Sequence, residues 1–87
     1  MTRILVVDDH PIVRRGLKQI FGETEDIIVA DEVDRGLDVL KKVRSQKYDL
    51  ILLDLSLPDM SGLEVLKELK AKKINIPVLI LSMYPEE

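Results

Sequence analysis

Two short apolar runs, each ending in carboxylates, constrain the fold of this chain most. Leu50–Leu53 ends at Asp54, and Ile4–Val7 ends at Asp8 and Asp9. Continuous apolar runs of this kind are typical of strands buried on both faces, as in a parallel sheet that helices cover. Because a buried charge is costly, each carboxylate is expected at the carboxyl end of its strand, facing a solvated crevice. In open α/β sheets, ligands bind at that edge.

The rest of the chain alternates strand-like and helix-like patterns. The expected order is strand 3–7, helix 11–22, a strand from Ile27 to at least Ala30, a helix after Asp34, strand 50–54, helix 61–72 and strand 78–81. This βαβαβαβ order predicts the α/β class, with one parallel, doubly wound sheet and right-handed crossovers. Periodicity alone leaves the order of the strands in the sheet open.

Each expected helix has a start signal and an apolar stripe. The start signals are Asp9 or His10 for the first helix, Asp34 for the second, and Ser61 with Glu64, a capping box, for the third. The residues expected to face inward are Ile12, Val13, Leu17, Ile20 and Phe21, then Leu37, Leu40 and Val43, then Leu63, Leu66 and Leu69.

The composition bounds the class of protein. With 87 residues the chain forms at most one small domain, and its 46% hydrophobic content is enough for a core. The net charge of −3 gives no reason to expect that this segment binds nucleic acid or an acidic membrane. The sequence has no cysteine, and no apolar run approaches the roughly 18 residues of a bilayer span. The simplest interpretation is a soluble, cytoplasmic domain.

Asp8, Asp9 and Asp54 are the main candidates for chemistry. Three carboxylates that converge on one crevice repel one another and favour a hard divalent cation such as Mg²⁺. A carboxylate can also attack phosphorus and form an acyl phosphate. The alternative is that Asp8 and Asp9 only cap the first helix and Asp54 only ends its strand.

Two further polar residues adjoin the ends of these strands. Ser82 follows the fourth strand, where its hydroxyl could donate to a phosphoryl oxygen or satisfy a backbone group. His10 could be a ligand or a base, but its place at a helix start favours a partly exposed neighbour of the cap. The sequence has neither a P-loop nor a dinucleotide fingerprint.

Three segments of the chain closely resemble the receiver domain of two-component response regulators. They are Ile4–Pro11, Asp54–Glu64 and Val78–Ser82, and their spacing fits along all 87 residues. The form of Asp8–Leu17 is most similar to receivers of the LuxR-type branch. The resemblance implies a flavodoxin-like receiver fold with strand order 2-1-3-4-5. It also implies a phosphoacceptor switch rather than an enzyme.

The resemblance assigns a role to each candidate residue. Asp54 would accept a phosphoryl group from a histidine kinase. Asp9 would bind Mg²⁺ directly, Asp8 would act mainly through water, and the backbone carbonyl of Ser56 would be a further metal ligand. Ser82 would be the switch hydroxyl that holds the phosphoryl group.

The resemblance also implies more chain than these 87 residues hold. Receivers continue through a helix, a strand that carries a lysine, and another helix, so residues 1–87 are expected to be one C-terminally incomplete receiver domain. LuxR-type regulators usually add a C-terminal helix-turn-helix DNA-binding domain, and no such output domain is expected here. The fourth strand would then be an apolar sheet edge, which predicts self-association by pairing or by element exchange.

Two other functions remain open for the sequence. The first is a receiver remnant that acts only as an oligomerising interaction module, without chemistry. The second is a small Mg²⁺-dependent phosphatase with Asp54 as a transient nucleophile. Enzymes of that type usually place an acid two residues after the nucleophile, where this chain has Ser56, so the second is disfavoured.

Overall fold

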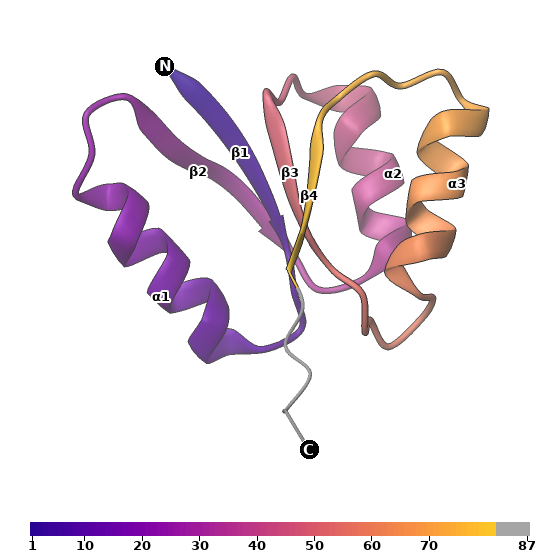
Figure 1. Cartoon of the computed structure of the whole chain (residues 1–87), viewed down its shortest axis with the longest axis horizontal. Helices are drawn as coiled ribbons and strands as arrows, with labels where there is room; N and C mark the ends of the chain where they lie inside the picture. Colours follow the sequence, from indigo (N-terminus) through magenta and orange to yellow (C-terminus); the bar gives the residue numbers. More distant parts are fainter. Residues whose placement is uncertain (82–87) are drawn as a thin grey trace.

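The structure is a computed structural model that describes residues 1–81. Its centre is one parallel sheet in the order β2-β1-β3-β4, as the resemblance implies (Figure 1). The strands are β1 (Thr2–Val7), β2 (Ile27–Val33), β3 (Leu50–Asp54) and β4 (Val78–Leu81). The predicted α/β class and the βαβαβαβ element order are confirmed.

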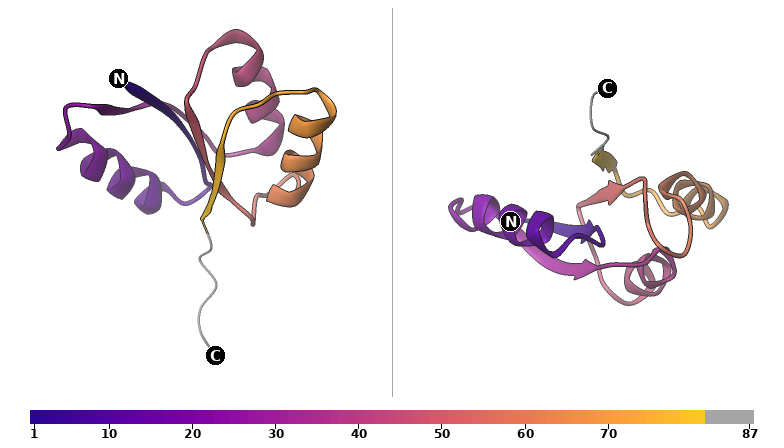
Figure 2. Two further views of the ribbon diagram at one scale, coloured as in Figure 1. Left: turned by 45° about the horizontal axis from the view of Figure 1, so that its top comes forward. Right: turned by 90° about the horizontal axis from the view of Figure 1, so that it is seen from below.

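Helices lie on both faces of this sheet, so the fold is doubly wound. They are α1 (Pro11–Gly22), α2 (Gly36–Ser45) and α3 (Gly62–Ala71). Helix α1 lies apart from α2 and α3, which are neighbours on the other side (Figures 1 and 2). This arrangement leaves the carboxyl ends of the strands uncovered by helix bodies.

The two central strands supply the core because their residues alternate between the faces. Leu5 and Val7 of β1 pack with residues of α2 and α3, among them Val39 and Val65. On the opposite face, the buried residues Ile4, Val6 and Leu52 pack against Leu17 and Phe21 of α1. The prediction that these continuous apolar strands are buried on both faces is therefore confirmed.

The predicted apolar stripes are wrong in four positions at the helix edges. Leu37 and Leu63 are 53% and 60% exposed, and Ile12 and Ile20 are 82% and 59% exposed. In α3, the buried residues are Val65 and Leu69, together with Gly62 at the helix start. Leu63 lies two positions from Val65, about 200° around the helix, so both cannot face the sheet. The helical spacing of apolar residues identified the apolar face of each helix, but not which residues lie at the centre of that face.

The start of α2 differs from the prediction. Its N-cap position is Arg35, which makes no side-chain cap bond, so Asp34 is not the cap. Instead, both carboxylate oxygens of Asp59, in the loop after β3, accept hydrogen bonds from the backbone N–H groups of Gly36 and Leu37, at 2.8 and 3.0 Å. Asp59, which is distant in sequence, thus accepts hydrogen bonds from two backbone N–H groups at the start of α2 that have no partner within the helix.

The other two helix starts agree with the sequence. Ser61 precedes α3, and its Oγ accepts a hydrogen bond from the backbone N–H of Glu64 at 3.2 Å. His10, one of the two residues predicted for the start of α1, occupies the N-cap position but makes no side-chain cap bond. Its imidazole ring instead contacts nearby carboxylates.

Candidate functional site

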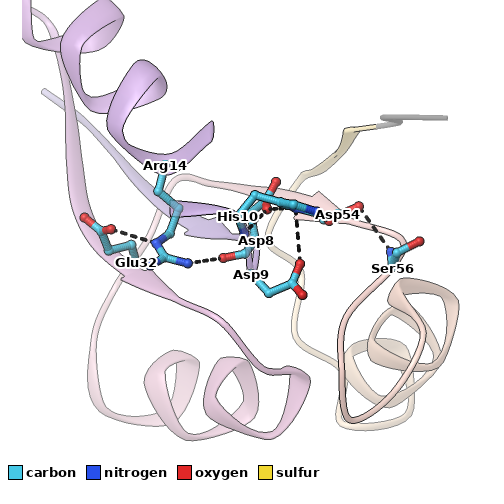
Figure 3. Close-up of polar contacts among 7 residues, drawn as sticks. All are labelled: Asp8, Asp9, His10, Arg14, Glu32, Asp54 and Ser56. Carbon is cyan, nitrogen blue, oxygen red and sulfur yellow. Dashed lines mark hydrogen bonds and ion pairs between the residues drawn. The ribbon is translucent and has the colours of Figure 1, made fainter. Parts of the chain in front are cut away.

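The carboxylates predicted to converge do lie together, at the carboxyl ends of β1 and β3. These strands pair in parallel with Val7 opposite Leu53, which places Asp8 beside Asp54. Asp9 follows on the same loop. Each of Asp8, Asp9, His10 and Asp54 offers one possible metal-ligand atom, a carboxylate oxygen or a ring nitrogen, and these four atoms lie within 4.8 Å of one another (Figure 3). We call these four residues the acidic cluster.

Asp8 is fully buried, although its strand ends there. Its backbone N–H donates to the carbonyl of Val33 at 3.1 Å, which extends the β1–β2 ladder by one residue. Its Oδ1 accepts the backbone N–H of His10 at 2.7 Å. Its Oδ2 has no hydrogen-bond partner among residues 1–81.

Asp54 is also buried, with 2% of its surface exposed. Its Oδ1 accepts the backbone N–H of Ser56 at 3.1 Å, which fixes the carboxylate relative to the loop. Its Oδ2 is buried and, like that of Asp8, meets no donor in the described part of the chain. A buried carboxylate oxygen without a partner is costly unless a cation neutralises it. The two orphaned oxygens therefore fit a divalent cation such as Mg²⁺.

The ring of His10 is turned into the acidic cluster. Its Nδ1 lies 2.6 Å from Asp8 Oδ1, 3.2 Å from Asp9 Oδ1 and 3.6 Å from Asp54 Oδ2. The hydrogen bond and the charge of Asp8 raise the pKa of His10 above its usual value. As expected, His10 is a partly exposed residue at the helix start, with 54% of its side chain exposed. Its contacts with the carboxylates were not predicted, because the sequence pattern does not specify where the ring points.

Sequence reasoning also missed Arg14, which braces the loop that carries Asp8. Its Nη1 donates to the backbone carbonyl of Asp8 at 2.6 Å, and its Nε donates to Glu32 Oε1 at 3.0 Å. Lys18 lies 2.8 Å from the other carboxylate oxygen of Glu32, and these two cations lower the pKa of Glu32, Lys18 most. The available signal was the spacing of Arg14 and Lys18, one turn apart on α1.

The loop after Asp54 lies close against the end of β3. The backbone N–H of Gly62 donates to the carbonyl of Leu55 at 2.9 Å. A Cβ on Gly62 would lie 2.8 Å from the carbonyl oxygen of Asp54, so a larger residue would push the loop away. Ser56, the predicted carbonyl ligand, lies in this loop, whereas Ser82 lies outside the described residues.

Comparison with known families identifies the class of protein. The family model "Response regulator receiver domain" matches residues 4–87. The chain therefore belongs to the response regulator receiver family. Members of this family are phosphoacceptor switches rather than enzymes in the usual sense.

The chain is similar to a longer curated protein of Bacillus subtilis (strain 168). YhcZ, an uncharacterized transcriptional regulatory protein, is 34% identical over 85 residues, which cover 98% of this chain and 40% of YhcZ. The chain therefore spans less than half of that relative.

Solved structures show the same fold. The response regulator TrrA of Thermotoga maritima, in complex with Mg²⁺-BeF, is 43% identical with a TM-score of 0.86, over 97% of this chain and 71% of that one. TrrA has also been crystallised with the histidine kinase ThkA, and that TrrA chain is 42% identical with a TM-score of 0.86, over 99% of this chain and 72% of the other. A LuxR-family regulator of Aurantimonas sp. is 29% identical with a TM-score of 0.87, over 98% and 61%.

No helix within residues 1–81 is both long and apolar enough to cross a bilayer.

Proposed function

We propose that Asp54 accepts a phosphoryl group from the phosphohistidine of a histidine kinase. The observation that supports this most is its buried Oδ2, which meets no donor in residues 1–81 and faces the acidic cluster. A carboxylate oxygen of Asp54 forms the new P–O bond while the P–N bond of the donor breaks. The departing histidine nitrogen keeps the electron pair and can take a proton, and Asp54 becomes an acyl phosphate.

We further propose that Mg²⁺ supports this transfer by neutralising charge on the phosphoryl oxygens. Asp9 and Asp54 would bind it directly, Asp8 would act mainly through water, and the backbone carbonyl of Ser56 would complete the protein ligands. The closeness of the carboxylates supports this assignment, and the similar protein TrrA has been crystallised with Mg²⁺-BeF.

Ser82 is proposed as the hydroxyl that holds the transferred phosphoryl group. Leu81 pairs with Asp54 across the β3–β4 ladder, so Ser82 is the next residue along the chain from a direct neighbour of the acceptor. Its proposed role rests on this sequence position and on the family.

The proposed partner is a cognate histidine kinase in the cytoplasm, a proposal supported by the complex of TrrA with ThkA. The matched part of YhcZ, a transcriptional regulatory protein, is 40% of its length. We therefore propose that the chain acts as the receiver of a longer transcriptional regulator, with a C-terminal helix-turn-helix domain that contacts DNA.

Incubation with acetyl phosphate and Mg²⁺, followed by intact-mass measurement, tests the acceptor. We expect one stable phosphoryl group on the wild-type chain and on Asp26→Asn, which changes an exposed carboxylate far from the cluster. Asp54→Asn should stay unmodified because an amide is not a nucleophile of this kind. Rapid release of phosphate without an adduct would instead identify a phosphatase, and no reaction would favour an interaction module.

A second proposal, self-association, is supported by the outer edge of β4. Within the described residues, β4 pairs only with β3, and its Leu79 is 55% exposed. The other edge strand, β2, carries the charges of Asp31 and Glu32, whereas Val78–Leu81 carries none. Apolar, uncharged edges tend to pair with another chain. The 87-residue chain is therefore expected to form dimers through β4.

Sedimentation equilibrium at micromolar concentration tests this second proposal. The wild-type chain should sediment as a dimer or larger species. Leu79→Lys should shift it toward monomer, because a charge at an edge opposes pairing. A compact wild-type monomer that unfolds cooperatively would contradict the proposal.

A further inference from the structure

His10 gives the acidic cluster a nitrogen donor. Its Nδ1 lies 3.2 Å from Asp9 Oδ1 and 3.6 Å from Asp54 Oδ2. Two ligands at right angles on a metal with bonds of about 2.1 Å lie about 3 Å apart. These two nitrogen–oxygen distances are already close to this spacing, so the ring needs only a small shift to join an oxygen-ligated ion.

The buried oxygens provide an independent sign of a cation at the same place. Asp8 and Asp54 are almost fully buried, and the Oδ2 atom of each has no partner within residues 1–81. The Oδ2 of Asp54 is the atom that faces His10 Nδ1. A cation placed between the ring and the carboxylates would satisfy an oxygen that the ring itself, at 3.6 Å, does not reach.

The kind of cation follows from the donors. Mg²⁺ prefers oxygen ligands and keeps several waters. Imidazole nitrogen instead suits ions such as Zn²⁺, Ni²⁺ and Fe²⁺, and affinity at a mixed N/O site rises along the first transition row. In a site with three carboxylates and one imidazole, the imidazole can therefore be an additional ligand for a transition-metal ion. Mg²⁺ uses such a nitrogen ligand poorly.

We propose that His10 Nδ1 is a ligand of the metal centre, and that this chain binds a divalent transition-metal ion more tightly than Mg²⁺. The inference rests on the metal centre of the proposed function and adds its metal preference. The competing account is that His10 only neutralises the carboxylates when no metal is bound. In that account every divalent ion displaces the ring in the same way.

Calorimetric titrations with Mg²⁺ and with Co²⁺ separate these accounts. We compare the wild-type chain with His10→Ala and with the control Ile12→Ala, which truncates an exposed side chain of α1. His10→Ala should weaken Co²⁺ binding by roughly tenfold or more, since it removes a ligand, and should change Mg²⁺ binding by less than about twofold. Equal effects on the two ions would overturn the inference.

A direct measurement of the bond is available because His10 is the single histidine of the chain. In the proton NMR spectrum of the Co²⁺-loaded chain, a Co²⁺-bound imidazole gives a strongly shifted, exchangeable ring N–H resonance. We expect this signal in the wild type and in Ile12→Ala. Its absence while Co²⁺ binds would overturn the inference and leave the proposed function standing. Failure of both ions to bind would overturn the metal centre of the proposed function as well.

Discussion

At the scale of single residues, the site is defined by negative charge that the described protein does not balance. Asp8 and Asp54 are buried, and Asp9 is about one-third exposed beside them. The only basic side chain that reaches their carboxylates within residues 1–81 is that of His10. Arg14 instead contacts the backbone carbonyl of Asp8. Charge repulsion inside the cluster is therefore available to drive cation binding.

The roles proposed for Asp8 and Asp9 predict an order of magnesium affinity. Asp9→Ala removes a direct ligand and should weaken Mg²⁺ binding roughly tenfold or more, whereas Asp8→Ala should weaken it less, because a water intervenes. Calorimetric titration measures both, with Asp26→Ala as a control for the loss of one remote surface charge. The opposite order would exchange the roles of the two aspartates.

The sequence predicted which carboxylates meet but not how the neighbouring cations lie. The aspartates follow apolar strands, and the edge of a parallel sheet brings such strand ends together. The direction of the His10 ring and the reach of Arg14 to Asp8 depend on side-chain conformations, which sequence spacing does not fix. The contacts of these two side chains are consequently what the structure adds to the site.

At the scale of elements, the loop after β3 links Asp54, the proposed acceptor, to α2. Asp59 accepts two backbone hydrogen bonds from the start of α2. A Cβ on Gly36 would collide with Met60 of the same loop, so the helix start and the loop also touch closely. Rearrangement of the loop at Asp54 would therefore be felt at α2.

Removal of the Asp59 carboxylate should destabilise the fold. Asp59→Ala leaves two helix donors without their partner, and we expect a loss of about 1 kcal/mol in the free energy of unfolding. Urea unfolding at equal chain concentration measures this loss. The matched control is Asp34→Ala, which removes the residue that the sequence predicted as the cap. A larger effect at Asp34 than at Asp59 would contradict the capping geometry.

The same cap predicts a dependence on pH. Burial alone would raise the pKa of Asp59, but backbone N–H donors, those of Gly36 and Leu37 first, outweigh it and hold the pKa below 3.8. The stability from this carboxylate is therefore full above that value and is lost as pH falls through the lower, folded pKa. In acid, the stability difference between wild type and Asp59→Ala should shrink. A difference that grows in acid would contradict this sign.

Two glycines should respond oppositely to the same substitution. Gly62→Ala places a Cβ against backbone atoms of Asp54 and Leu55 and should destabilise by about 1–3 kcal/mol. Gly16→Ala meets nothing within 4 Å and should stabilise α1 by up to about 1 kcal/mol. Thermal unfolding of both variants checks this. A Gly62→Ala chain as stable as wild type would show that the loop has room to move.

The helix caps and the buried face of α3 show which contacts local sequence patterns can predict and which they cannot. Ser61 caps α3 as predicted because cap and helix are adjacent in sequence. The cap of α2 was missed because Asp59 lies 23 residues from the N–H of Gly36, and local signals cannot encode such a contact. Similarly, Leu63 was expected inside, but packing of α3 centres on Val65 and Leu69.

At the scale of the whole molecule, the order of helices and strands along the chain was predictable from local residue patterns, but the order of the strands in the sheet was not. The alternation of strand and helix follows from local periodicity. The order β2-β1-β3-β4 followed only from the family resemblance, because residue patterns do not state which strands are neighbours. That order is what places Asp8 beside Asp54. The candidate site is thus a product of the global topology acting on locally recognisable strand ends.

The central proposal is that Asp54 is the residue that becomes phosphorylated. After reaction with acetyl phosphate and Mg²⁺, treatment with borohydride reduces an aspartyl phosphate to homoserine, which peptide mass spectrometry then locates in the sequence. The account predicts homoserine at position 54 in the wild type and at no position in Asp54→Asn. Homoserine at position 8 or 9, or a modified Asp54→Asn chain, would contradict it.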